Sequence, residues 1–217
     1  ILDNLDIEKI RNIDKFTSNK LRSVTLSICY NKKENPNLEI ENFLQSICIE
    51  AERVINSDAC NIIILSDREV DQNNIAIPAL LATSSVHHHL IKKGLRTKVG
   101  LIIETGEARR VHDLCLLAGY GAEAINPYLA FYTLSNIIKN HNQEIEEKEA
   151  YTKYIKAVTK GMLKVMSKMG ISTYQSYSGA QIFDAVGLSS NLVDRYFCGT
   201  SSKVEGIDLE EIQIETE

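Results

Sequence analysis

The residues best suited to chemistry lie in one segment, residues 86–113, which opens with a run of three histidines at positions 87–89. Imidazole is a common metal ligand and general base, so the run suggests a metal site or a histidine-based active site. Successive helical residues diverge by about 100°, however, and metal sites on helices use ligands three or four positions apart. The residues four positions after the first two histidines are Ile91 and Lys92, which are not ligands. We therefore expect no metal site, and at least one buried histidine held by a hydrogen bond.

Charged residues follow two strand-like runs. Asp67 and Arg68 close the stretch ILSDR, where they indicate either a charged hinge or ligand contact, or a surface ion pair worth about 0–1 kcal/mol. In the stretch ETGEAR, Glu104 and Glu107 are three positions apart and form an acid/base pair, as in glycoside hydrolysis, only if both face one cleft. Because Glu107 stands at an expected helix start, where the helix dipole favours a carboxylate, a capping role is favoured.

Other motifs lack the partners that catalysis needs. Cys198 precedes Gly199 and Thr200 and offers a nucleophile, but no histidine lies near it in the sequence. The stretch GYGA (119–122) leads from an expected helix into an expected strand, so it predicts a helix C-cap and not a phosphate loop. The five cysteines form no CxxC pair and are odd in number, which favours free thiols over disulfides or a zinc site.

Hydrophobic patterns predict the elements that must position these residues. Apolar runs predict strands at 23–30, 60–67, 97–105 and 122–126, with a loop at 31–37 after the first. Helical periodicity, with Pro78 and Pro127 opening helices and Gly94 closing one, predicts helices at 38–55, 78–93, 107–117 and 127–139. This alternation predicts an α/β fold with a parallel sheet or a partial (β/α) barrel, whose loops gather at the carboxyl ends of the strands.

The character of the chain changes after a polar, acidic stretch at 140–149. A long amphipathic helix is expected at 151–169, closed by Gly170, followed by two short helices, the second capped by Ser189 or Ser190. Another helix opens in EGIDLEEI at 205–212. We therefore predict an α/β domain at 1–145 and a mostly helical part at 146–217.

Composition narrows the classes of partner. The 217 residues carry a formal net charge of −5 and no dense basic stripe, which argues against nucleic acid as a partner. No apolar run approaches the roughly 20 residues that span a bilayer, and the acidic N-terminal stretch is unlike a secretory signal, so we expect no membrane partner. Because the chain opens at Ile1 without a Met, and ends at Glu217 just after a helix begins, we expect a piece of a longer protein.

Taken together, several strings closely resemble the central region of the large glutamate synthases. The resemblance covers the chain from about Cys60 to Ile212, and the first 59 residues fit the same region more weakly. The strings that carry it, in order and spacing, are ILSDR, IPALLATSSVHHHLIKKGLRT, ETGEARRVHDLCLLAGYGAEAINPYLAF, YIKAVTKGMLKVMSKMGISTYQSYSGAQIFDAVGL and VDRYFCGTSSKVEGI.

The resemblance implies a multidomain iron-sulfur flavoprotein. In this family an amidotransferase domain releases ammonia from glutamine, and an FMN barrel reduces the imine formed from 2-oxoglutarate and that ammonia to give L-glutamate. Electrons come from ferredoxin, or from NAD(P)H through a small subunit, and pass through a 3Fe-4S cluster. The resembling segment is the connecting domain beside the ammonia tunnel, so FMN, the cluster and the catalytic residues are expected outside this chain, and residues 164–173 near the flavin domain.

Under this resemblance the histidine run is expected to be structural or interdomain, and no residue of the chain to be catalytic. Polar residues at the expected strand ends and adjoining helix starts become candidates for interdomain contacts or for the approach to the ammonia tunnel. They are Asp67, Arg68, His87, Glu104, Glu107, Arg109 and Asn126.

The abundance of Ile, Asn and Lys is typical of A+T-rich genomes and favours a ferredoxin-dependent enzyme of the plastid stroma, with a bacterial cytoplasmic enzyme as the alternative. Two different functions remain open at this stage. One is a stand-alone small α/β enzyme with a histidine-rich active site in residues 86–113. The other is an interaction module that has lost its catalytic partners.

Overall fold

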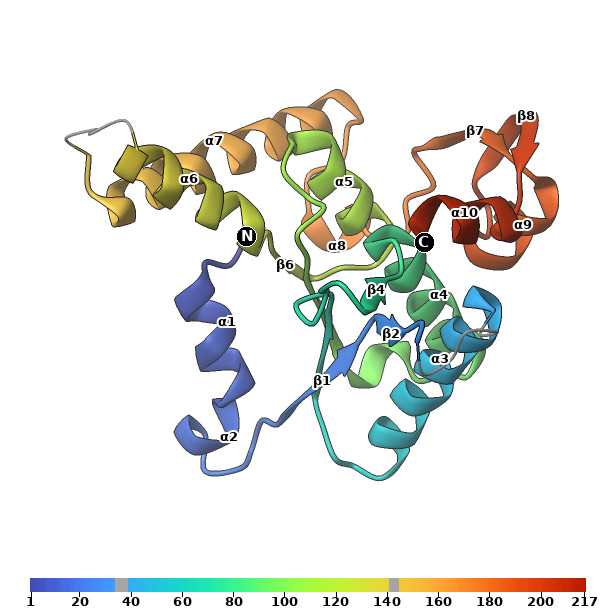
Figure 1. The fold of residues 1–217 in the computed structure, drawn as a ribbon, viewed down its shortest axis with the longest axis horizontal. Coiled ribbons are helices and arrows are strands. Elements are labelled where there is room, and N and C mark those ends of the chain that lie inside the picture. Colours follow the sequence, from blue (N-terminus) through green and yellow to red (C-terminus); the bar gives the residue numbers. More distant parts are fainter. Residues whose placement is uncertain (34–38, 141–144) are drawn as a thin grey trace.

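A four-stranded parallel sheet with the strand order β1-β3-β5-β6 forms the centre of the molecule (Figure 1). The structure, a computed structural model, describes residues 1–33, 39–140 and 145–217. The strands of the central sheet are β1 (Ser23–Ser27), β3 (Ile62–Ser66), β5 (Gly100–Glu104) and β6 (Ala124–Asn126). All neighbouring pairs are parallel, with helices in the connections, so the predicted α/β class is confirmed.

Helices cover both faces of this sheet. The helices that the structure describes are α1 (Asn4–Arg11), α2 (Ile13–Phe16), α3 (Ile40–Asn56), α4 (Ala79–Lys92), the 3-10 turn η1 (Arg96–Lys98), α5 (Val111–Gly119), α6 (Tyr128–Asn140), α7 (Glu147–Lys168), α8 (Tyr174–Tyr177), α9 (Ser190–Tyr196) and α10 (Leu209–Thr216). Of these, α1 covers one face, and α3, α4 and α5 cover the other. In Figure 1, α1 and α2 lie on one side of β1, and α3 and α4 on the other. No helix of the described ranges is long and apolar enough to cross a membrane.

The strands β3 and β5 have no polar side chain before their last residues, Ser66 and Glu104, because both of their faces are covered. Ile63 and Leu65 of β3 face the large core, which also contains apolar residues of α3, α4 and α5. Ile64 of β3 and Ile102 of β5 face the other way and pack with Ile7 of α1. Alternate residues of a strand point to opposite faces, so helix α1 forms the cover of the second face.

The two small sheets were not predicted. β2 (Cys29–Asn31) pairs antiparallel with β4 (Asn74–Ala76), and β7 (Asp184–Leu188) pairs in parallel with β8 (Ser201–Ile207). The predicted strand 23–30 therefore divides at Ile28, whose N–H still bonds to Ser66 of the central sheet while its carbonyl accepts from Ile77. β7 and β8 are largely exposed and their register is interrupted, so they lack the apolar alternation that identifies a strand.

Most predicted helices are confirmed, with small shifts at their ends. Gly94 and Gly170 follow α4 and α7 with φ of 66° and 70°, the left-handed conformation of a helix C-cap. The predicted strand 97–105 begins only at Gly100, because η1 occupies its first residues. Helix α5 begins at Val111 and not at 107, since the intervening residues form the loop after β5. Parts of the predicted loop 31–37, the start of the predicted helix at residue 38, and part of the stretch 140–149 lie outside the described residues.

The part after residue 146 is helical in α7 to α10 but also contains β7 and β8. In Figure 1, α9, α10 and these strands form a lobe on the side of the molecule away from α1. Val158 and Met162 of α7, Tyr177 and Leu192 nevertheless belong to the same large core as the sheet and its helices. The predicted division into parts at 1–145 and 146–217 stays a prediction.

Candidate functional site

Strand register places four polar residues in one row where the parallel strands end. Ser27 is in register with Ser66, Ser66 with Glu104, and Glu104 with Asn126. Residues in register on parallel strands point to the same face, and here that face is the one covered by α1. We call this end of the sheet the carboxyl edge, and the opposite end, where β5 and β6 begin, the amino edge.

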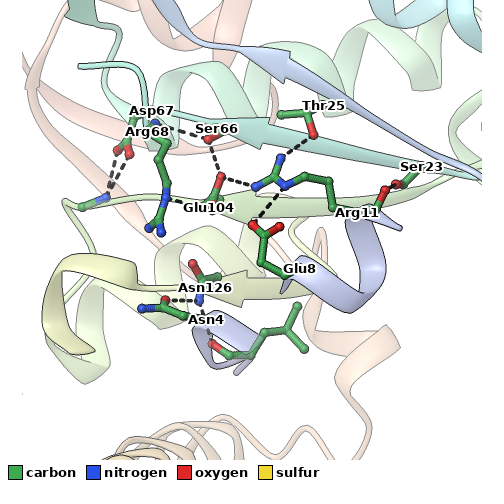
Figure 2. A network of polar contacts seen from close by, with 12 residues as sticks. Asn4, Glu8, Arg11, Ser23, Thr25, Ser66, Asp67, Arg68, Glu104 and Asn126 are labelled. Carbon is green, nitrogen blue, oxygen red and sulfur yellow. Dashed lines mark hydrogen bonds and ion pairs between the residues drawn. The ribbon is translucent and has the colours of Figure 1, made fainter. Parts of the chain in front are cut away.

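Glu104 lies at the centre of the row and is fully buried. It accepts hydrogen bonds from the Ser66 hydroxyl and from Nη2 of Arg11, the latter at 2.9 Å, and its Oε1 lies 3.6 Å from Nε of Arg68 (Figure 2). Arg11 also donates to Oγ1 of Thr25 on β1. A buried carboxylate costs several kcal/mol unless its charge is compensated, and two guanidinium groups provide the compensation here. The network thereby fastens α1 to β1 and β5.

Arg68 connects this carboxylate to helix α6. Its guanidinium carbon lies 4.6 Å from the ring centre of Tyr128 and 5.4 Å from that of Tyr132, and its Nη2 donates to the Tyr132 hydroxyl at 2.9 Å. A cation over an aromatic face gains about 0.5–2 kcal/mol. Arg68 therefore fixes the start of α6 relative to β3 and β5.

Asp67 is buried and does not form the surface ion pair that we considered for it. It accepts from Oγ1 of Thr105 at 2.6 Å and from the backbone N–H of Gly106 at 2.9 Å, whereas Arg68 turns to Glu104. Burial raises the pKa of Asp67 above its usual value, and the bonds from Thr105 and Gly106 oppose that rise. Asp67 thus ties the loop after β3 to the loop after β5.

Glu107 caps a helix, as expected, but not the helix it precedes. Its Oε2 accepts from the backbone N–H of Ala79 at 2.8 Å, at the start of α4. The start of α5 is served by Asp113, whose Oδ2 accepts from the N–H of Arg110 at 3.0 Å. Desolvation raises the pKa of Glu107, as do the nearby carboxylates of Asp67 and Asp113. Glu104 turns to α1 and Glu107 to α4, on opposite faces of the sheet, so the two do not form an acid/base pair in one cleft.

Arg109 and Glu107 line a cavity of 560 Å³ at the starts of α4 and α5. The side chain of Arg109 is exposed, and its backbone carbonyl accepts from the Tyr154 hydroxyl of α7 at 3.1 Å. This cavity lies beside the carboxyl edge, where the sequence had placed both residues.

Asn126 holds the first residues of the chain against β6. Its Nδ2 donates to the carbonyl of Leu2 and to Oδ1 of Asn4, both at 3.1 Å, as Figure 2 shows. Among the described residues, its Oδ1 is buried without a hydrogen-bond partner, and so are Oε1 of Glu104 and Nη1 of Arg68. Three buried polar atoms of the carboxyl edge therefore form no hydrogen bond with the described residues.

The structure separates His87 from the other candidates. Nε of Arg96 donates to its Nδ1 at 3.0 Å, and the same guanidinium bonds to the carbonyls of Val99 and Gly121, which precede β5 and β6. His87 therefore lies at the amino edge. Burial, with the charge of Arg96, lowers the pKa of His87 to about 4.

The three histidines point to different neighbours. Nε2 of His89 lies 3.1 Å from Oε2 of Glu52 on α3, and the ring of His88 stands edge-on to that of His87 at 5.2 Å between centres. His87 is the buried, hydrogen-bonded histidine that the sequence predicts. Across the part of the chain that the structure describes, no three His, Cys, Asp or Glu side chains are placed to hold one metal ion.

Sequence reasoning missed the partners that complete the network. Arg11 is 93 positions from Glu104, and Ser66 and Tyr128 had not been singled out. A signal for α1 was available: Asp3 accepts from the N–H groups of Leu5 and Asp6 as an N-cap, ahead of apolar residues at helical spacing. That signal predicts the helix but not where the helix packs.

At the carboxyl edge, Glu8 and Glu104 together balance the charges of Arg11 and Arg68. A buried polar network of this kind fixes the geometry of the elements it joins and does not leave an acid or base free for proton transfer. The site therefore has the character of a rigid junction at the end of the sheet, with three unused polar atoms.

Comparisons with known proteins agree with this architecture. Residues 1–189 match the glutamate synthase central domain family. The chain is 51% identical over 179 residues to the NADPH glutamate synthase large chain of Bacillus subtilis, covering 82% of this chain and 12% of the relative. It is 46% identical over 161 residues to the NADH glutamate synthase of Saccharomyces cerevisiae, covering 70% and 8%. It is 34% identical over 228 residues to a chloroplastic ferredoxin-dependent glutamate synthase of Oryza sativa, covering 100% and 14%.

Solved structures share the fold at low identity. A double mutant of flavocytochrome b2 with sulfite bound superposes with a TM-score of 0.50 at 15% identity, covering 80% of this chain and 49% of that one. The same double mutant with pyruvate bound gives 0.50 at 11% identity, covering 82% and 51%. These likenesses show the α/β fold alone.

The chain spans about an eighth of the length of its Bacillus subtilis relative. Its identity to that relative and the family match over residues 1–189 confirm the resemblance carried by the motifs. The chain belongs to the glutamate synthase central domain family.

Proposed function

We propose that this chain connects the two catalytic domains of a large glutamate synthase, which forms L-glutamate from L-glutamine and 2-oxoglutarate. In this role it holds an amidotransferase domain and an FMN-binding domain in a fixed arrangement and borders the path of ammonia between them. The observation that carries the proposal is the buried network of Arg11, Arg68 and Glu104, which ties α1 and the loop after β3 to the carboxyl end of β5.

The chemistry explains why rigidity matters. Ammonia released at one site must reach the second before it is protonated and lost to solvent, so the passage has to stay closed to bulk water. A junction whose strand ends are cross-linked by buried polar bonds keeps such a passage aligned. Asp67, Arg68, Glu104, Glu107, Arg109 and Asn126 remain the candidates for this junction.

His87 is not among these junction residues, because it lies at the amino edge. The histidine run also gives little support to a stand-alone enzyme in residues 86–113. The three rings have separate partners, and Glu104 and Glu107 turn to opposite faces of the sheet.

The cofactors expected of the longer enzyme do not fit this chain. A 3Fe-4S cluster needs several cysteines together, whereas the five cysteines are free and no described group of three ligands forms. The phosphate of FMN favours a helix N-terminus with free N–H groups, but α4 and α5 already receive the carboxylates of Glu107 and Asp113 there. We place both cofactors in other parts of the longer enzyme.

The relatives differ in the electron donor that their names give. Sequence composition favours ferredoxin in a plastid, and ferredoxin-dependent relatives, some of them chloroplastic, are 34–38% identical. The NADPH and NADH enzymes reach 51% and 46%. From this higher identity we infer the alternative electron donor, NAD(P)H, which reaches the enzyme through a small subunit. A bacterial cytoplasmic location accompanies this alternative. Glutamate formation by the full-length enzyme with NADPH, NADH or reduced ferredoxin decides between them.

The connecting role is tested by coupling between the two reactions. In the full-length enzyme, Arg68→Met removes the link between Glu104 and Tyr128, and we expect less glutamate formed for each glutamine hydrolysed. Arg195→Met is the matched control, because Arg195 also lies over a tyrosine, Tyr196 at 5.3 Å, and pairs with Glu41, but far from the carboxyl edge. A wild-type ratio in Arg68→Met would contradict the proposal.

A further inference from the structure

A cavity of 310 Å³ opens at the amino edge, away from the carboxyl-edge network. It lies between α4, the turn at the end of α5, the segment before β7 and the segment after α9. Its lining includes His87, His88, Tyr120, Gln181, Cys198 and Thr200. Its volume is at the lower end of the range for small-molecule sites, about 300–1,000 Å³.

His87 presents an unused hydrogen-bond donor in this cavity. Nε of Arg96 donates to Nδ1 of His87, so Nδ1 carries the lone pair and the proton of the neutral ring is on Nε2. The Nδ1 side of the ring is packed against Gly121, which leaves the Nε2 side for the cavity. His87 is only 8% exposed, and within the described ranges its Nε2 has no partner.

His88 adds a second unused nitrogen from the next position of α4. Its Nε2 is buried and has no hydrogen-bond partner among the residues that the structure describes. Leaving a buried polar atom unpaired costs about 1–3 kcal/mol, and such atoms are uncommon in folded proteins. Both imidazoles belong to the wall of the cavity, so a ligand there can complete their bonding once the His88 ring turns its enclosed nitrogen outward.

Gln181, in the lining of the same cavity, has a strained backbone conformation. Its φ is 54°, a left-handed conformation that a residue with a side chain adopts at a cost, and its amide packs closely against Gly199. A Cβ on Gly199 would collide with that amide, so glycine is required for the close approach. Strained backbone of this kind is concentrated at binding sites.

The charges around the cavity favour an anion. None of its lining residues is acidic, and the cation of Lys92 lies close enough to act on His88. Arg96 lies on the Nδ1 side of His87, where its charge is paired with Glu123 at 2.9 Å. The hydroxyls of Tyr120 and Thr200 are 2.6 Å apart, so one of them keeps a free lone pair or proton for a ligand. Neutral donors with a nearby cation and no carboxylate in the lining are suited to carboxylate oxygens.

The fold places Cys198 in one cavity with two histidines, but its thiol bonds to the backbone and not to either imidazole. Its Sγ lies 2.9 Å from the carbonyl of Asp194, so the thiol proton is engaged in a hydrogen bond to the backbone. The rate at which Cys198 is alkylated can therefore report whether a ligand occupies the cavity.

We propose that the cavity lined by His87, His88, Gln181 and Thr200 is a binding site for a small carboxylate, held by non-covalent bonds to the two imidazoles and the neighbouring amide and hydroxyl groups. The site is separate from the junction at the carboxyl edge, and it does not depend on the proposed function.

The test measures how fast Cys198 is alkylated by iodoacetamide in the full-length protein, read for each cysteine by peptide mass spectrometry. Succinate is the carboxylate probe and succinamide its uncharged counterpart. At a succinate concentration about ten times its Kd, we expect the Cys198 rate to fall about tenfold. Cys29, a half-buried cysteine at the carboxyl edge, is the internal control and should keep its rate.

His88→Leu separates a ligand role from a structural one, because Nε2 of His88 bonds to no other described group that the variant would lose. We expect this variant to fold and to lose the protection by succinate, with the Cys198 rate in the absence of succinate little changed. Gln181→Ala, at an exposed side chain, is the second variant and should weaken the protection.

Four results would overturn the proposal: no protection by succinate, equal protection by succinamide, undiminished protection in both variants, or no alkylation of Cys198 in the native protein. The last would mean that another part of the longer chain fills the cavity.

Discussion

The carboxyl and amino edges of the sheet bury polar groups by different means. At the carboxyl edge, Glu104 is surrounded by Arg11 and Arg68, so opposite charges compensate one another. At the amino edge, His87 lies beside the cation of Arg96, and burial lowers its pKa to about 4. One edge keeps its charges by pairing them, whereas the other keeps an ionisable group neutral.

The difference teaches what each edge is suited to do. Paired charges within a strand row lock helices and strands together, which suits a junction between domains. Neutral imidazoles keep donors and acceptors that the chain does not use, which suits the reception of a ligand. The comparison can be tested by breaking the pairing at one edge, the neutrality at the other, and the packing that enforces that neutrality.

The largest effect is expected from Glu104→Ala. The change leaves Arg11 and Arg68 without their shared carboxylate, and breaking a buried ion pair costs about 3–5 kcal/mol. Hydrogen exchange of the β3 and β5 amides in the full-length protein measures this as a fall in the local free energy of opening. Glu104→Gln keeps an acceptor for the Ser66 hydroxyl and should lose less.

Glu8→Ala is the matched control, since Glu8 also pairs with Arg11, at 3.2 Å, but is largely exposed. An exposed pair contributes about 0–1 kcal/mol, so the exchange of β3 and β5 should hardly change. Equal losses in the Glu8 and Glu104 variants would mean that burial adds nothing at this edge.

Much of the carboxyl edge could be predicted from the sequence. The continuous apolar run of β3 and the proline and glycine that bound α4 identify the alternating elements, and parallel strands necessarily bring Asp67, Glu104 and Asn126 to one edge. The packing partners could not be predicted, because Arg11 reaches Glu104 through the placement of α1 on the sheet. Sequence periodicity indicates that α1 has an apolar face but not which surface receives it.

The position of His87 along the sheet could have been predicted from the length of helix α4. Helix α4 starts at the carboxyl edge and runs back along the sheet, and nine residues of helix after Pro78 advance about 13 Å, most of the length of a five-residue strand. His87 therefore had to lie near the amino edge. The cavity at that edge could not be predicted, because Gln181 and Cys198 come from a lobe whose strands carry little apolar pattern.

The second prediction concerns pH at the amino edge. His87 has a folded-state pKa of about 4 and an ordinary value of 6.5, so the unfolded state binds more protons between these values. The contribution of neutral His87 to stability is full above pH 6.5 and is lost as the pH falls to about 4, a change of about 3 kcal/mol. Hydrogen-exchange protection factors of β5 and α4 across this range measure the slope.

His87→Gln should flatten that slope, because glutamine keeps an acceptor for Arg96 but does not titrate. His88 has a pKa lowered by burial and contributes in the same direction, so a smaller slope should remain. His112→Gln, at an exposed histidine of α5, is the control and should keep the wild-type slope. A wild-type slope in His87→Gln would show that the acid sensitivity of this edge comes from other groups.

The smallest effect is the difference in stability loss between alanine variants of two glycines, Gly94 and Gly121, that both have a positive φ. Gly121 has φ of 114° and its missing Cβ would meet the ring of His87, whereas Gly94 has φ of 66° with open space around it. Gly94→Ala should cost about 1–2 kcal/mol for the left-handed backbone alone. Gly121→Ala should cost about 2 kcal/mol more, because the His87 ring must move away from Arg96 as well. Thermal midpoints or exchange at β6 measure both, and equal costs would mean that the ring is free to move, so that its neutrality is not enforced by packing.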